Sequence, residues 1–254
     1  MTIKDKINFN FDGVWSDTLG LISVNTDGGM FEEIFVADRN IVETEVLGSD
    51  RPIFHRLENA PIEFDLTIAF EDGFDDDKID YIVRWLFSDY YKPLYFEGRE
   101  DRVYKCIVSG GSSLIHNGLK EGYFVVTVRC DSAKIYSPIH LSDKITSTSE
   151  SNLTIFNDGH YDSYPEISIK KIGDGDVEII NNSDGGDIFK IINLTDREDI
   201  YIDCERELIE TDAIGIYRYE NVVGLFTRLI EGNNEIKIVG NCEIQFRYTF
   251  KYKF

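Results

Sequence analysis

The sequence lacks any long hydrophobic run. No stretch reaches the roughly 18 apolar residues that a transmembrane helix needs, so we expect no insertion into a membrane. The N-terminal segment MTIKDKINFNFDGVW also lacks the apolar core of a signal peptide. We therefore expect the protein to be made and folded in a cytosol.

Basic residues are scarce. The chain has 26 Lys and Arg residues against 47 Asp and Glu residues, which gives a formal net charge of -21. Binding to nucleic-acid phosphates or to anionic lipid requires cationic side chains. The composition therefore argues against nucleic-acid binding and against docking on a membrane, and it favours high solubility.

The motifs of metal sites are missing as well. The four cysteines, at 106, 130, 204 and 242, form no CxxC pair and lie in apolar or alternating segments, which predicts buried thiols. The four histidines include no pair at i and i+4. The acidic segment EDGFDDDKID lacks the ligand spacing of an EF-hand loop, so a charged helix start is predicted there. We expect no bound metal and no cofactor.

Signatures of catalysis are missing too. The chain has neither a GxSxG nucleophile elbow nor a GxxxxGK[ST] phosphate loop. A carboxylate pair of the glycosidase type stays open, since 47 acidic residues make chance pairs unavoidable. Because no motif places activated groups in defined roles, we predict no catalytic residue and no enzyme.

Alternation with a period of two is abundant. In the C-terminal EIQFRYTFKYKF, apolar side chains alternate with polar ones, so one strand face is predicted to be buried and the other, with Lys251 and Lys253, to face water. Similar short strands recur from PEISIKKI to DIYIDCE, separated by turn signals such as GDGD. The pattern predicts a mainly β protein built from antiparallel sandwiches or barrels.

One segment is typical of a helix, at residues 76–88. Asp75 or Asp76 is suited to the N-cap, and the acidic first turn suits the helix dipole. The apolar residues recur at the spacing of a single helix face: Ile79, Ile82, Val83, Leu86 and Phe87. We expect an amphipathic helix packed on a sheet.

The composition shifts near the middle of the chain. The segment SPIHLSDKITSTSESNLTIFNDG is rich in Ser and Thr and shows no strong alternation before Leu153. We therefore place a boundary near residue 138 and expect two β-rich domains, at residues 1–137 and 138–254.

Several stretches, taken in order, resemble a known family. A polar hairpin precedes a strand in EEIFVADRNIVETEVLGSDRPIFHRLENAPIEFDLTIAFED, and the helix is followed by KPLYFEGREDRVYKCIVSGG. GYFVVTVRCDSAKIYSP matches a strand that closes a first domain, and NDGHYDSYPEISIKKIGDGDVEIINNSDGGDIFKI opens a second. In this order the stretches resemble the distal tail proteins of long-tailed (siphovirus-type) bacteriophages and of prophage-derived tail structures. One departure is Asp131-Ser132-Ala133, where the family often has a proline.

The resemblance implies a fold and a role. Distal tail proteins have an N-terminal, ring-forming, β-sandwich-like domain with one helix and an extended hairpin, followed by a galectin-like β-sandwich. Six copies form a ring at the tail tip, which joins the tail tube to the tail-associated hub or lysin. The tape-measure protein and, in many phages, receptor-binding proteins are further partners. The resemblance thus implies a non-enzymatic virion protein of the tail tip or baseplate, assembled in the host cytoplasm and active in host attachment and genome ejection.

The hairpin region, from about Arg39 to Arg56, is the predicted site of contact between subunits. A protruding arm can clasp its neighbour in a closed ring, although an ordinary solvated hairpin is the open alternative. The charged candidates for this interface are Arg39, Glu43, Glu45, Asp50, Arg51 and Arg56. The acidic excess suggests in addition a channel wall that repels DNA and lets it slide.

A carbohydrate-binding β-sandwich for host cell-surface glycans is the alternative function. Sandwich domains present surface aromatics and hydrogen-bonding groups that suit sugars. His160 and Tyr161 are the candidate sugar contacts, and the competing interpretation is that these rings pack at strand ends.

Overall fold

The computed structural model describes residues 6–24 and 36–253. Residues 1–5 and 25–35 and Phe254 lie outside the described residues, and with them the first part of the EEIFVADRN stretch and the last position of the C-terminal alternation. The chain divides into two compact units. The first comprises the described residues up to Tyr136 together with Lys253, and the second runs from Ser137 to Tyr252.

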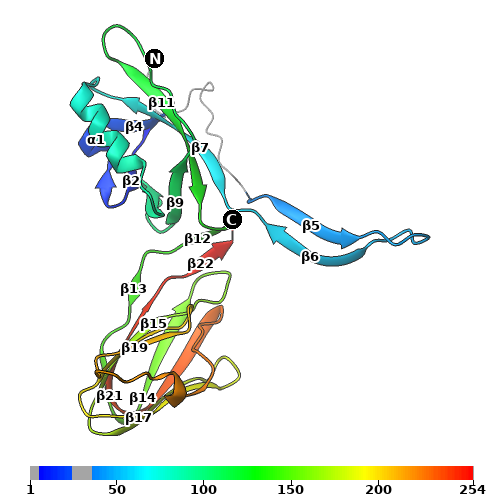
Figure 1. The fold of residues 1–254 in the computed structure, drawn as a ribbon, viewed down its shortest axis with the longest axis vertical. Helices are drawn as coiled ribbons and strands as arrows, with labels where there is room; N and C mark the ends of the chain where they lie inside the picture. The colour runs from blue at the N-terminus through cyan, green and yellow to red at the C-terminus, as the bar shows by residue number, and fades with distance from the viewer. Residues whose placement is uncertain (1–5, 25–35, 254) are drawn as a thin grey trace. The chain divides into compact units, whose positions relative to one another are not determined.

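The first unit is built on a nine-stranded antiparallel sheet (Figure 1). Its strands follow the order β1-β4-β7-β11-β9-β8-β2-β3, with β10 paired to β11. Their bounds are β1 Lys6–Ile7, β2 Phe9–Phe11, β3 Val14–Trp15, β4 Leu21–Val24, β7 Glu63–Phe70, β8 Lys92–Phe96, β9 Tyr104–Ser109, β10 Ile115–His116 and β11 Gly122–Cys130. A 3-10 turn, η1 (Ser16–Leu19), precedes β4, and the short strand β12 (Lys134–Tyr136) ends the unit.

The predicted helix is present as α1, Asp76–Leu86, and it ends two residues earlier than expected. Asp75 is its N-cap, because its carboxylate accepts a 2.8 Å hydrogen bond from the backbone N–H of Lys78. The helix is tied to the sheet by Trp85, whose Nε1–H donates to the carbonyl of Phe11 at 2.9 Å. The Trp85 ring also stacks on Phe9 with centroids 6.0 Å apart. The apolar helix face therefore covers the core at β2.

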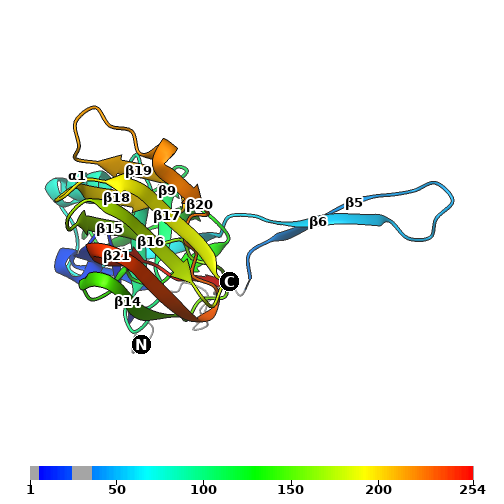
Figure 2. The same cartoon turned by 90° about the horizontal axis from the view of Figure 1, so that it is seen from below.

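The second unit is a second nine-stranded antiparallel sheet, ordered β19-β18-β15-β21-β16-β17-β20, with β13 and β14 also paired to β21. Figure 2 shows β18, β15 and β21 side by side. The bounds are β13 His140–Leu141, β14 Ile145–Asn157, β15 Glu166–Lys171, β16 Gly175–Asn181, β17 Asp187–Leu194, β18 Asp199–Asp203, β19 Leu208–Thr211, β20 Val222–Gly224 and β21 Gly232–Tyr248. A 3-10 turn, η2 (Tyr219–Asn221), precedes β20.

The long strand β21 turns this sheet into a sandwich. Its residues 236–239 pair with β16, whereas residues 242–247 pair with β15 on the same edge. The change of partner falls at Gly240, which has a φ of +118°. The strands β19, β18 and β15 thus form one layer and β16, β17 and β20 the other, and their apolar faces enclose one core that includes Ile167, Ile179, Phe189, Ile202, Ile238 and Phe246.

The predicted fold class is confirmed: the protein is mainly β, with two β-sandwich-like domains, and its described residues include one helix and an extended hairpin. The prediction of an alternating strand at the C-terminus is correct only in part. β21 ends at Tyr248, and the last strand, β22, spans Lys251–Lys253. Between them Phe250 exchanges hydrogen bonds with Ser137, and Phe250, Lys251 and Tyr252 are all buried. The expectation that Lys251 faces water is therefore wrong, and its ammonium is ion-paired with Glu205.

Candidate functional site

The predicted interface region forms a hairpin of two strands, β5 (Arg39–Thr44) and β6 (Ile53–Asn59). Among the described residues these strands pair only with each other, as a separate two-stranded sheet (Figures 1 and 2). Most of their side chains are exposed. An isolated two-stranded ribbon buries too little apolar surface to be stable by itself, which is typical of a segment that acquires its packing from a partner.

All six predicted interface residues lie on this hairpin and are exposed: Arg39, Glu43, Glu45, Asp50, Arg51 and Arg56. The structure does not gather them into one cluster. The register shifts between Val42 and Glu43, where β6 has one extra residue, so Arg56 faces Val42 while Phe54 faces Glu43. Arg56 bonds Glu58 on its own strand at 2.6 Å, an exposed ion pair that contributes little to stability.

The same register aligns apolar residues of the hairpin into a stripe. Ile41 pairs with Leu57, and Phe54 follows on the same face opposite Glu43. Ile41 and Phe54 are each 62% exposed. The tip adds Val46 and the fully exposed Leu47, in a turn closed by the bond from the N–H of Ser49 to the carbonyl of Val46 at 3.0 Å. An exposed apolar stripe of this kind marks an interaction surface.

The two predicted sugar contacts lie elsewhere, in the second unit. The exposed ring of His160 meets the ring of Tyr252 edge-on, with centroids 5.8 Å apart. Tyr161 forms a β-bridge with Lys251, and the N–H of His160 donates to the carbonyl of Lys251 at 2.9 Å. The structure places both residues beside β22, where they hold the end of the chain.

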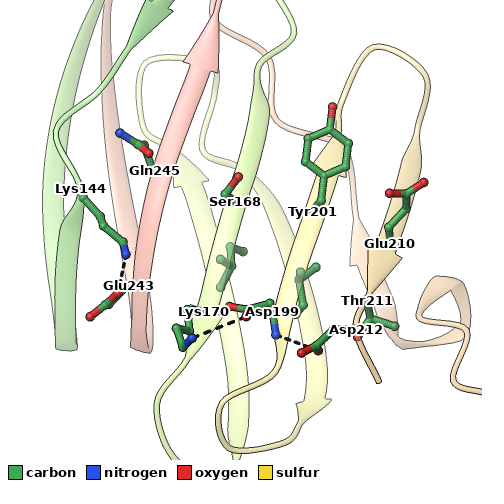
Figure 3. A pocket seen from close by; sticks show the side chains of 12 residues that line it. Lys144, Ser168, Lys170, Asp199, Tyr201, Glu210, Thr211, Asp212, Glu243 and Gln245 are labelled. Carbon is green, nitrogen blue, oxygen red and sulfur yellow. Dashed lines mark hydrogen bonds and ion pairs between the residues drawn. The ribbon is translucent and has the colours of Figure 1, made fainter. Parts of the chain in front are cut away.

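A shallow groove of about 570 Å³ lies on the polar face of β21, β15, β18 and β19 (Figure 3). Its middle row consists of four side chains directly opposite one another across the strands: Gln245, Ser168, Tyr201 and Glu210. Ser168 is the smallest of the four, and it forms the floor of the groove between Gln245 and Tyr201. Neither His160 nor Tyr161 lines this groove.

Ion pairs border the groove on both sides. On one side Arg247 bonds both carboxylate oxygens of Glu166 at 2.6 Å. On the other, Lys144 pairs with Glu243 at 2.7 Å and Lys170 with Asp199 at 3.5 Å (Figure 3). The alternation of polar and apolar residues predicted that each of these strands has a polar face. Which polar side chains lie opposite one another depends on the pairing of strands that are distant in the sequence.

Tyr201 is the aromatic member of the row. Burial, together with a hydrogen bond to the Glu166 carboxylate, raises the pKa of Tyr201 to about 12. The protonated phenol donates to Glu166, whose carboxylate is itself fixed by Arg247. This chain of contacts holds the ring in one orientation beside Ser168 and Glu210.

The cysteines are free and buried in both units. Burial raises the pKa of all four thiols, to about 12 for Cys130 and Cys204, so they stay protonated and act as small apolar side chains. Within residues 6–24 and 36–253, no group of three or more His, Cys, Asp and Glu side chains is arranged to hold a metal ion. Over the same part of the chain, no helix is long and apolar enough to cross a membrane.

Comparison with known families assigns both units. Residues 4–132 match a family described as a phage tail protein N-terminal domain, and residues 134–248 match a phage tail C-terminal domain. The chain belongs to this family of phage tail proteins. A relative of this tail protein is the SPbeta prophage-derived protein YomH of Bacillus subtilis (strain 168). The two are 31% identical over 252 residues, which cover 98% of this chain and 99% of YomH.

Solved structures with the same fold come from phage tails. The tail protein superposes on the SPP1 Dit protein with a TM-score of 0.69 and 16% identity, covering 96% of this chain and 98% of Dit. That structure is described as a paradigm of the hub adsorption apparatus in phages that infect Gram-positive hosts. A chain of the phage P2 baseplate matches with a TM-score of 0.59 and 8% identity, covering 96% of this chain and 97% of that one.

Proposed function

We propose that this phage tail protein is a distal tail protein, a structural hub of the tail tip. The observation that carries the proposal is the match of both domains to SPP1 Dit over 96% of the chain, because a likeness of one β-sandwich alone would be far less specific. Its proposed partners are the tail tube, the tail-associated hub or lysin, the tape-measure protein and receptor-binding proteins. The role is non-enzymatic, in the virion, after assembly in the host cytoplasm.

The proposed assembly is a ring of six copies around a channel for DNA. Support comes from the apolar stripe of the β5–β6 hairpin, where Ile41 and Phe54 are each 62% exposed and Leu57 is half-buried. Rings close through heterologous contacts, in which an arm on one copy meets a different surface on the next. The arm therefore serves as the clasp between neighbouring subunits.

The ring is tested by the mass of the purified chain in solution. Six copies of the 29.2 kDa chain give a particle of about 175 kDa, which mass photometry resolves from a monomer or dimer. Ring-shaped particles in negative-stain micrographs are the matching expectation. A chain that stays monomeric at every concentration, and also when co-expressed with its tail-tube partner, contradicts the proposal.

The arm is tested by removing its tip, residues 45–51. Because every residue of the tip is exposed, the shortened chain is expected to fold with an unchanged melting temperature and to lose the hexamer. Intact hexamers after this deletion would show that another surface closes the ring.

A further inference from the structure

The groove on the second unit has the features of a ligand site that the hub role does not use. Its volume of about 570 Å³ lies within the range of about 300–1,000 Å³ typical of small-molecule sites. Its floor is Ser168, its aromatic wall is Tyr201, and its rim carries Glu210 (Figure 3). Ser168 lies on β15, Tyr201 on β18 and Glu210 on β19, which pair in this order, so these side chains come from a sheet rather than from loops.

The middle row offers unused hydrogen-bonding groups. Over residues 6–24 and 36–253, neither the Ser168 hydroxyl nor the Glu210 carboxylate has a protein partner, and both side chains are exposed. The Gln245 amide donates to the carbonyl of Ser142 at 2.9 Å, which orients the side chain and leaves its oxygen as an acceptor. A hydroxyl, an amide oxygen and a carboxylate therefore line one short row beside a fixed aromatic ring.

The charge of the groove lining restricts which kind of ligand can bind. Both lysines of the groove are ion-paired, Lys144 with Glu243 and Lys170 with Asp199. Glu210 and Asp212 remain, so the lining has a surplus of acidic groups over basic ones. An anionic ligand would be repelled, whereas a neutral ligand rich in hydroxyl groups can donate to the carboxylate and to the amide oxygen.

We propose that this groove binds a neutral saccharide, with a sugar ring against Tyr201 and its hydroxyl groups bonded to Ser168, Gln245 and Glu210. An aromatic ring presents an apolar face to the C–H side of a sugar, and the polar row satisfies the hydroxyls around it. Binding of this kind gives the second unit a role in recognising surface glycans. It does not depend on the proposed ring, since every residue of the groove lies in one unit.

The proposal is tested with the full chain on a glycan array that contains neutral and acidic bacterial saccharides. The strongest neutral ligand is then titrated by saturation-transfer difference NMR. Replacing Tyr201 by Ala is expected to weaken binding about tenfold, because the stacking face is lost. Glu210→Ala is a second variant, which removes an exposed carboxylate with little effect on folding.

The matched control is Tyr217→Ala, which deletes a tyrosine that is 83% exposed and does not line the groove. Neutral glycan binding that is weakened by Tyr201→Ala and Glu210→Ala and unchanged by Tyr217→Ala supports the site. The proposal is overturned if the chain binds no neutral saccharide, if it binds acidic ones only, or if all three variants behave alike. Circular dichroism and melting temperatures establish that each variant is folded.

Discussion

At the scale of single residues, the buried ion pair of Glu198 and Arg218 is the least expected feature of the second unit. Arg218 Nε donates to one carboxylate oxygen of Glu198 at 2.7 Å and Nη2 to the other at 2.5 Å. Thr195 and Thr211 donate to the same carboxylate, and Arg218 Nη1 reaches the carbonyl of Asn193 at 3.1 Å. The pair therefore ties η2 to the ends of β17, β18 and β19.

The pair is an example of desolvation outweighed by hydrogen bonding. Burial by itself favours the neutral acid, but the hydrogen bonds from Arg218, Thr195 and Thr211 dominate together and lower the pKa of Glu198 to about 2. In the unfolded chain the pKa is near 4.5, so the folded state holds fewer protons between these two values. The stabilisation by this carboxylate is complete above about pH 4.5 and is lost as the pH falls toward 2.

We predict that Glu198→Gln lowers the free energy of unfolding at pH 7 by about 3–5 kcal/mol, because it leaves Arg218 charged, buried and without its counterion. Urea unfolding of the native chain and of the Glu198→Gln chain, each at pH 7 and at pH 3, measures this loss. The difference in unfolding free energy between the two chains should be smaller at pH 3. Glu220→Gln, at an exposed neighbouring position, is the control and should match the native chain. An equal loss of unfolding free energy at both pH values would contradict the lowered pKa of Glu198.

At the scale of elements, β21 organises the second unit through one glycine. Gly240 lies between the segment that pairs with β16 and the segment that pairs with β15. Its φ of +118° is a conformation that L side chains rarely adopt. A Cβ there would lie 2.5 Å from the carbonyl oxygen of Asp176, in backbone that cannot easily move. The bend of the strand thus requires this residue.

Gly240→Ala is predicted to destabilise the second unit by at least about 2 kcal/mol, because backbone strain and a backbone clash act together. Thermal unfolding followed by circular dichroism measures the loss. Gly215→Ala is the control: it has a positive φ of 77°, but no atom lies within 4 Å of the position that its Cβ would take, so it isolates the strain without the clash. Equal losses in the two variants would show that the contact with Asp176 is unimportant.

In the hairpin β5–β6, the effect of a substitution on folding can be separated from its effect on assembly. Phe54 lies on its apolar stripe and is 62% exposed, so Phe54→Glu should change the stability of the folded chain by no more than about 0.5 kcal/mol. A charge within a dry interface is costly, so the same change should abolish assembly. Sedimentation velocity compares it with Leu119→Glu, whose side chain is 81% exposed outside the hairpin and which should assemble normally. Assembly of the Phe54→Glu chain at native strength would exclude the stripe from the interface.

At the scale of the whole molecule, the net charge of -21 governs association. In the proposed ring each added copy would meet the acidic excess of the others, so electrostatic repulsion would oppose assembly unless ions screen it. The Debye length falls from about 10 Å at 0.1 M to about 3 Å at 1 M salt. The same acidic excess suits the proposed channel, in which DNA would pass without adhering, because phosphate binding requires cationic contacts.

Rising salt is therefore predicted to strengthen assembly of the ring. The fraction of hexamer, measured by mass photometry at a fixed protein concentration, should increase between about 0.05 M and 0.5 M sodium chloride. The proposed clasp at Ile41, Leu57 and Phe54 is apolar, so screening by salt does not weaken its contacts. Dissociation of the hexamer at high salt would instead indicate an interface held by ion pairs, for example between Arg39 or Arg51 and acidic groups of a neighbouring copy.

The sequence by itself determined the mainly β class, the single helix and the acidic character, because these depend on local periodicity and composition. The helix cap was narrowed to Asp75 or Asp76, because caps are encoded within a few neighbouring residues, and the structure shows that it is Asp75. The hairpin was expected from the resemblance to a family, and the structure shows its two strands paired with each other. The resemblance to phage tail proteins followed from the order of such local signals.

Only the tertiary structure decided what depends on register between distant strands. The row of Gln245, Ser168, Tyr201 and Glu210 exists because β21, β15, β18 and β19 align at one register, and a slip by one residue would turn these side chains into the core. The Glu198–Arg218 pair and the buried Lys251 likewise depend on partners brought together by the fold. Alternation tells which side of a strand is polar, but only the pairing of strands tells which polar groups meet.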